Sequence, residues 1–133
     1  MATEDVGKLL LRLSLGVLIL LHGIAKVIGG PGGIIGLVQG VGLPAAFGYL
    51  VYVGEVIAPL FVIAGFWTRP AALIIAINMI VAVLLVHTAD IFTLTATGGW
   101  ALELQGLYFF VAVAVALLGA GRYSVGGVRG RWN

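Results

Sequence analysis

The chain has 133 residues, of which 62% are hydrophobic and 9% charged, with a formal net charge of +2. Soluble domains carry roughly a quarter charged residues, so this composition excludes a soluble globular protein and predicts a single membrane domain over residues 1–133. The absence of cysteine excludes disulfides, thiolate metal sites and iron–sulfur clusters. The small net charge gives no reason to expect nucleic-acid binding.

Four apolar stretches are long enough to cross a bilayer, which takes about 20 residues. They lie at about 6–28, 47–67, 70–88 and 100–120. No cleavage-site pattern follows the first stretch, so we expect a retained span and not a signal peptide. An open strand would leave backbone groups unpaired in lipid. The sequence therefore predicts an all-α membrane protein with a four-transmembrane-helix bundle.

Positive charges distinguish the two ends of the predicted bundle. With four spans, both termini and the second connection share one side of the membrane. That side collects six of the seven basic residues: Lys8, Arg12, Arg69, Arg122, Arg129 and Arg131. The positive-inside rule then places both termini in the cytoplasm. The Gly- and Arg-rich tail at about 126–133 is expected to be disordered.

The connection at about 29–46 carries no charge, although loops in water are normally polar. Gly32, Gly36 and Gly40 recur every four residues, opposite branched apolar side chains. This spacing predicts a short interfacial or re-entrant helix between the first and second spans, packed against them by its glycine face. A flexible apolar loop is the alternative.

Ionisable residues at membrane depth cost about 2.5–3.5 kcal/mol each on insertion scales, which makes them candidates for function. The outer half of the bundle collects the predicted ligand-binding residues: His22, Lys26, Glu55, His87 and Glu103. Glu55 is the candidate proton carrier, because a short carboxylate at that depth needs a partner or a proton. No other catalytic residue is assigned. His and carboxylates are too few to predict a metal site.

Other roles stay open for several of these side chains. Lys26 can snorkel to the outer interface or pair with Glu55 or Glu103. His87 can be a capped interfacial residue, and Glu103 can simply be solvated.

Two further polar residues lie deeper toward the cytoplasm. We expect Arg12 to snorkel to the inner headgroups and Asn78 to hydrogen-bond between helices. A bis-histidine haem would need His22 and His87 at matching depth on facing helices. Their predicted depths differ by about one helical turn, which disfavours haem.

Short motifs follow one another in a set order along the chain. They are Arg12-Leu13-x-Leu15-Gly16, His22-Gly23-x-x-Lys26, Gly42-Leu43-Pro44, Gly54-Glu55, Gly65-x-x-Thr68-Arg69-x-Ala71-Ala72, Glu103 and Gly121-Arg122-Tyr123-Ser124. In this order, over about 9–125, the chain resembles the DoxX family of small four-helix bacterial membrane proteins. Val125 departs from the family, whose usual residue there is acidic.

The resemblance implies a place beside redox enzymes in the cytoplasmic membrane of a bacterium or archaeon. DoxX-like proteins are named for a subunit of an archaeal quinol-oxidase and thiosulfate:quinone oxidoreductase system, and others are linked to membrane-associated redox complexes. Residues on motif positions are His22, Lys26, Glu55, Arg69 and Glu103.

The leading hypothesis is a redox-linked accessory or quinone-interacting subunit of a membrane oxidoreductase. His22 would bind a quinone carbonyl, Glu55 would carry the proton, and Lys26 would bias the charge of Glu55. No redox cofactor is evident, so electrons would come from a partner protein, and catalysis by this chain alone is not expected. The alternatives are a non-catalytic scaffold or assembly subunit and, ranked last, a small-molecule transporter. The 21 glycines also permit a homo-oligomer in the bilayer.

Overall fold

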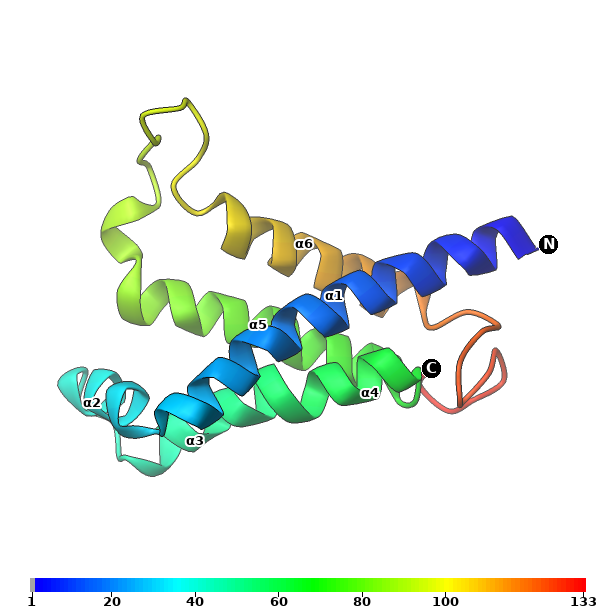
Figure 1. Ribbon diagram of the computed structural model, residues 1–133, viewed down its shortest axis with the longest axis horizontal. Helices are drawn as coiled ribbons and strands as arrows, with labels where there is room; N and C mark the ends of the chain where they lie inside the picture. The colour runs from blue at the N-terminus through cyan, green and yellow to red at the C-terminus, as the bar shows by residue number, and fades with distance from the viewer. Residues whose placement is uncertain (1) are drawn as a thin grey trace.

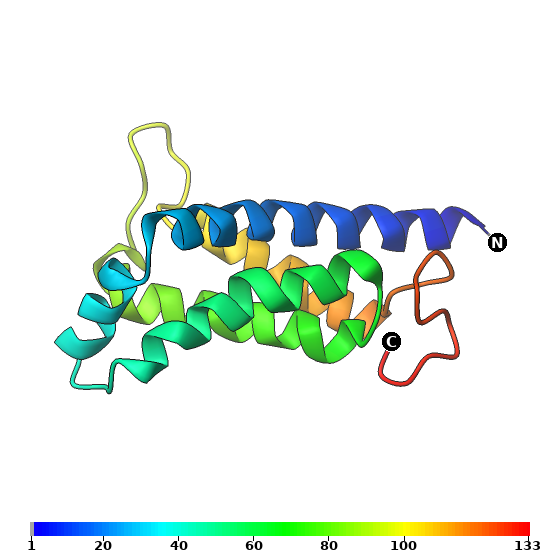
Figure 2. The ribbon, with the colours of Figure 1, turned by 60° about the horizontal axis from the view of Figure 1, so that its bottom comes forward.

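The computed structural model describes residues 2–133, in which regular structure is helical apart from one isolated β-bridge between Leu94 and Trp100. Four rods form an elongated bundle (Figure 1). They are α1 (Ala2–Gly29), the joined segments α3 (Ala46–Tyr52), η1 (Val53–Ile57) and α4 (Ala58–Ala64), then α5 (Thr68–Val86) and α6 (Glu103–Leu118). Both chain ends lie at one end of the bundle, here named the terminal end (Figure 2). Helix α2 (Gly32–Gly40) and the short helix η2 (Thr88–Asp90) lie at the opposite, distal end.

Three of the rods are long and apolar enough to cross a membrane: Thr3–Gly29, Ala46–Ala64 and Thr68–Val86. They correspond to the predicted spans at 6–28, 47–67 and 70–88. Helix α6 is also apolar but has 16 residues, about 24 Å at 1.5 Å per residue, against a hydrocarbon core of about 30 Å. It is therefore shorter at both ends than the predicted span at 100–120.

The bundle has a small dry core and a broad apolar exterior. The core contains side chains from all four rods, including Leu15, Val62, Ile75 and Ala112. Large apolar side chains that are more than half exposed occur on every rod, among them Leu10, Leu50, Ile77, Leu84 and Leu117. A surface of this kind needs lipid or another apolar partner. The chain is therefore an integral membrane protein.

The second rod changes from α-helix to π-helix at η1 and returns to α-helix at α4. Pro59, near the start of α4, lacks the N–H that would bond to the carbonyl of Glu55, and its ring crowds that carbonyl. A single π-helical turn accommodates this local conflict. Such turns are rare and are frequent at functional sites, and this one contains Glu55.

The predicted helix between the first two spans is present as α2, but it packs on the face opposite to the predicted one. Val38 is buried, and Ile35 lies against Gly48 of α3. No atom lies within 4 Å of a Cβ added at Gly32, Gly36 or Gly40. The expectation of a packed glycine face is therefore wrong, because the branched side chains fill the space above α3 and α5 that glycines would leave empty.

At the terminal end, Arg12 is 2% exposed and does not snorkel. Its Nε donates to the carbonyl of Val62 at 2.7 Å, and Nη2 to that of Ile63 at 3.3 Å. Nη1 and Nη2 also donate to the carbonyls of Ala120 at 2.7 Å and Tyr123 at 3.0 Å. Val62 and Ile63 lie in the last turn of α4, and Ala120 and Tyr123 in the segment after α6, where a helix leaves its carbonyls short of partners. A buried guanidinium satisfies them and complements the helix dipoles, so the snorkelling prediction for Arg12 is wrong.

The tail at 126–133, expected to be disordered, instead folds back on the start of α5. Thr68 Oγ1 donates to Asn133 Oδ1 at 2.8 Å, and the Arg69 N–H donates to the carbonyl of Trp132 at 3.0 Å. The ring of Trp132 stands edge-on to Trp67, with 5.2 Å between centroids. The first N–H groups of a helix have no partner within the helix, and the tail supplies acceptors for them.

Candidate functional site

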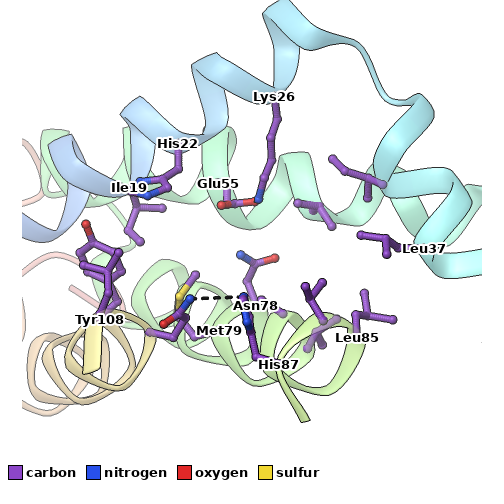
Figure 3. Close-up of a pocket in the computed structure, with 17 residues that line it drawn as sticks. Ile19, His22, Lys26, Leu37, Glu55, Asn78, Met79, Leu85, His87 and Tyr108 are labelled. Carbon is purple, nitrogen blue, oxygen red and sulfur yellow. Dashed lines mark hydrogen bonds and ion pairs between the residues drawn. The ribbon is translucent and has the colours of Figure 1, made fainter. Parts of the chain in front are cut away.

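A cavity of about 230 Å³ lies in the distal half of the bundle (Figure 3). Helix α1, η1, α5 and α6 form its walls, and Ile34 and Leu37 of α2 lie across its distal side. The polar residues that line it are His22, Lys26, Glu55, Asn78, His87, Gln105 and Tyr108. The other lining side chains are apolar. We call this cavity the polar chamber.

An ion pair between Lys26 and Glu55 lies on one wall of the chamber. Lys26 Nζ donates to Glu55 Oε2, and the two side chains are 38% and 4% exposed. A buried carboxylate is costly unless it is paired. Of the roles left open for Lys26, the structure shows pairing with Glu55. The half-exposed stem keeps the ammonium group close to the surface of the bundle.

Two glycines allow this pair to form. A Cβ added at Gly23 of α1 would overlap the backbone carbonyl oxygen of Glu55, so α1 approaches η1 as closely as only glycine permits. On the other side of η1, a Cβ added at Gly54 would lie 2.7 Å from the side chain of Asn78. The close approach from both sides brings Lys26 of α1 and Asn78 of α5 beside Glu55 (Figure 3).

The two histidines lie on opposite walls and have different partners. His22 Nδ1 lies 2.9 Å from the carbonyl of Leu18, and its ring stands edge-on to Tyr108. A carbonyl only accepts, so Nδ1 carries the proton in neutral His22, and Nε2 is an acceptor. His87 ends α5, with Nδ1 3.5 Å from Asp90 Oδ2 and Nε2 3.5 Å from Gln105 Nε2. Both ring nitrogens of His87 therefore face protein groups.

Of the five predicted ligand-binding residues, the structure brings four together in the chamber: His22, Lys26, Glu55 and His87. Glu103 lies outside it. Its exposed side chain is at the start of α6, where a Cβ added at Gly99 would lie 2.7 Å from Oε2. An acid is favourable at a helix N-terminus. Within residues 2–133, no group of three or more His, Asp or Glu side chains is close enough to hold a metal ion.

Arg69, the remaining residue on a motif position, lies at the terminal end, far from the chamber. Its Nη1 donates to the carbonyls of Ala116 at 3.0 Å and Leu117 at 2.7 Å. Those carbonyls belong to the last turn of α6, where no helical partner is present. Arg69 therefore caps α6, while Arg12 binds carbonyls of the segment that follows this helix.

Three chamber residues were not among the predicted ligands: Asn78, Gln105 and Tyr108. They carry no charge at neutral pH, so the rarity of charged residues in apolar spans does not single them out. Gln105 and Tyr108 are three residues apart and share one face of α6, a signal that the sequence does contain. Asn78 was expected to hydrogen-bond between helices; in the structure its side chain packs beside Gly54 and points into the chamber.

Comparison with known proteins gives one result. A family model described as DoxX matches residues 7–88, which include most of α1, all of α2 to α5 and most of the chamber. Helix α6 and the tail lie beyond the match. No curated protein and no solved structure matches the chain. The matched stretch is more than half of the sequence and contains the motifs around Arg12, His22 and Glu55, and the protein therefore belongs to the DoxX family.

Proposed function

We propose that the protein is a quinone-interacting accessory subunit of a membrane oxidoreductase system, with the polar chamber as the head-group site. The observation that carries this proposal is the buried Glu55–Lys26 pair, which lies beside His22 and Asn78 in an otherwise apolar cavity. Drug-sized ligands occupy pockets of about 300–1,000 Å³. At about 230 Å³ the chamber suits a single flat ring with two oxygen substituents.

The chamber offers both donors and acceptors to such a ring. The ammonium of Lys26 and the amide of Asn78 can donate to carbonyl oxygens, whereas the carboxylate of Glu55 can accept from a hydroxyl. His22 also accepts at Nε2 when neutral, because Nδ1 faces the carbonyl of Leu18. This differs from the carbonyl-binding role predicted for His22. In the proposal these two acceptors bind the hydroxyls of the reduced, dihydroxy form of the ring.

A bound quinol supplies two protons and two electrons. In the proposal, Glu55 and His22 receive the protons at the carboxylate and at Nε2. Lys26 holds the carboxylate of Glu55 in the chamber through their ion pair. The electrons pass to a redox protein partner, so the chain acts as a subunit and not as an enzyme alone.

We also propose that α6 is a fourth span. A short helix can end inside a membrane only if its last backbone groups are satisfied. Arg69 caps the carbonyls of Ala116 and Leu117, and Arg12 caps that of Ala120. The N–H of Ala120 donates to the carbonyl of Asn133 at 2.6 Å. Together these groups support a crossing by the 16-residue helix and the turn that follows it.

The proposed orientation has the terminal end in the cytoplasm of a bacterium or archaeon. Six of the seven Lys and Arg residues lie in segments that reach this end, whereas Lys26 lies in the last turn of α1, toward the distal end. The positive-inside rule favours this direction. The polar chamber then lies in the outer half of the membrane, with α2 as an interfacial helix above it.

Glu55→Gln is expected to weaken quinol binding by about tenfold or more, since a hydrogen bond to a charged group is worth about 1.5–3 kcal/mol. Binding would be measured by titrating the purified protein in lipid nanodiscs with a soluble quinol. Glu103→Gln is the matched control, because it removes a carboxylate outside the chamber, and it should bind as the wild type does. Absence of saturable binding to the wild type, or equal binding by Glu55→Gln, would contradict the proposal.

A scaffold role is the second candidate, and the contact of Gly23 with the Glu55 backbone favours it because that contact fixes the register of α1 on η1. A scaffold predicts that Glu55→Gln and His22→Phe both lower the melting temperature in detergent. The quinone proposal predicts little change for Glu55→Gln, since glutamine still accepts from Lys26 and the long Lys26 stem can reach the interface. Thermal unfolding of the two variants therefore separates the candidates. A large loss in both, with unchanged quinol binding, supports the scaffold.

A further inference from the structure

A second cavity, of about 320 Å³, lies between the α3–η1 segment and α5, beneath α2. Its lining is apolar except for Asn78, and its principal side chains are Phe47, Leu50, Ile74 and Ile77. We call it the apolar groove. The groove and the polar chamber share four lining residues: Val51, Asn78, Val81 and Leu85. The two hollows are therefore neighbours separated by a thin partition of side chains.

Three of the shared residues form a common wall between the polar chamber and the apolar groove. Asn78, Val81 and Leu85 follow one another at helical spacing along one face of α5, so this face is a common wall. Helix α2 covers both hollows, with Leu37 over the chamber and Val38 over the groove. Asn78 is the polar side chain at the junction, beside Gly54 and the ion pair.

The groove opens toward lipid, whereas the chamber holds the buried charge. Leu50 and Ile77 line the groove and are 57% and 59% exposed, but Glu55 in the chamber is 3% exposed. A path from Glu55 to the membrane thus begins in a charged environment, passes the neutral polar side chain of Asn78 and ends among apolar side chains. This order of environments matches an amphiphile with one polar head and one apolar chain.

We propose that the apolar groove holds the tail of the ligand whose head lies in the polar chamber. The ligand is then a long-chain quinol that enters sideways from the bilayer between α3 and α5, beneath α2. This inference rests on the proposed function and adds the tail site and the access route.

A third cavity, of about 250 Å³ between α5 and α6, is the competing route. It shares only Met79 and Gln105 with the chamber and lies on the α6 side of α5, where Ile80 and Leu84 line it. The groove is favoured because it begins at Gly54 and Asn78, next to the ion pair. The test must therefore distinguish the cavity that Ile77 lines from the one that Ile80 lines.

The test compares two probes in lipid nanodiscs: a dimethoxy-methyl-benzoquinol without a tail, and the same ring with a decyl chain. Ile77→Trp fills the groove. Ile80→Trp is the matched control, with the same change on the same helix at a similarly exposed position that lines the other cavity. Ile77→Trp should weaken binding of the decyl quinol by about tenfold more than it weakens binding of the tailless ring. Ile80→Trp should change the affinity for neither probe.

Partition of the decyl chain into lipid is the same for each variant, so it cancels when the ratio of the two affinities is compared between a variant and the wild type. A chain-borne diazirine gives an independent readout, with cross-links expected at Leu50 and Ile77 and not at Ile80 and Leu84. Equal effects of Ile77→Trp on both probes, or discrimination by Ile80→Trp instead, would overturn the tail site while binding of the tailless ring still upholds the proposed function. Failure of both probes to bind the wild type would overturn the proposed function and the tail site together.

Discussion

Replacement of Arg12 by Met is expected to lower the free energy of unfolding by about 4 kcal/mol, the largest effect in the chain. The buried guanidinium donates to four carbonyls, two in the last turn of α4 and two in the segment that follows α6. A buried acceptor left without a partner costs about 1–3 kcal/mol, and methionine fills the space without donating. The measurement is thermal unfolding in a mild detergent, followed by tryptophan fluorescence.

Arg129→Met is the matched control for this change, because it removes the same side chain from an exposed position in the tail. Its melting temperature should equal that of the wild type. Arg12→Lys should fall in between, since an ammonium has three donors on a single atom and cannot reach all four carbonyls. A melting temperature of Arg12→Met close to that of Arg129→Met would show that the carbonyls find other partners.

Gly23→Ala is expected to have the second-largest effect, on both stability and binding. The new methyl group would overlap the carbonyl oxygen of Glu55, so α1 must move away from η1. Overpacking of this kind costs about 1–3 kcal/mol, and the displacement would separate Lys26 from Glu55. Both the melting temperature and quinol binding should therefore fall.

Gly7→Ala tests whether the loss comes from this contact and not from a change in helix propensity. Gly7 lies in the same helix, and nothing is within 4 Å of a Cβ added there. Alanine is the better helix former by about 1 kcal/mol, so Gly7→Ala should be neutral or slightly stabilising. If Gly23→Ala also proved neutral in both measurements, close contact between α1 and η1 would not be required for the chamber.

The three long spans could be predicted from the sequence because each depends on one local quantity, the length of an apolar run. The proximity of four predicted ligand-binding residues could also be predicted. Ionisable side chains are rare in such runs, and the depth of each in the membrane follows from the helical rise. The position of Glu103 could not be predicted in this way. It depends on where α6 begins, and helix boundaries depend on tertiary contacts.

Arg12 shows a second limit of reasoning from local sequence. Its partners are 50 to 111 residues away along the chain, and they exist only because α4 and α6 end at the same depth. Hydropathy considers each span by itself, without the partners that other helices provide, and therefore predicts that Arg12 snorkels to the headgroups. The same limit applies to α2, whose packing face is set by the shape of the space above α3 and α5.

The separation between Arg12 and its acceptors also has a consequence for biogenesis. Arg12 in α1 leaves the ribosome well before Ala120 and Tyr123, which emerge only after α6. The first span must therefore enter the bilayer with an uncompensated guanidinium, at a cost of about 2.5–3.5 kcal/mol that its long apolar run offsets. Nascent chains arrested before α6 should accordingly hold Arg12 at the headgroups, and α6 would draw it inward once that helix has been made.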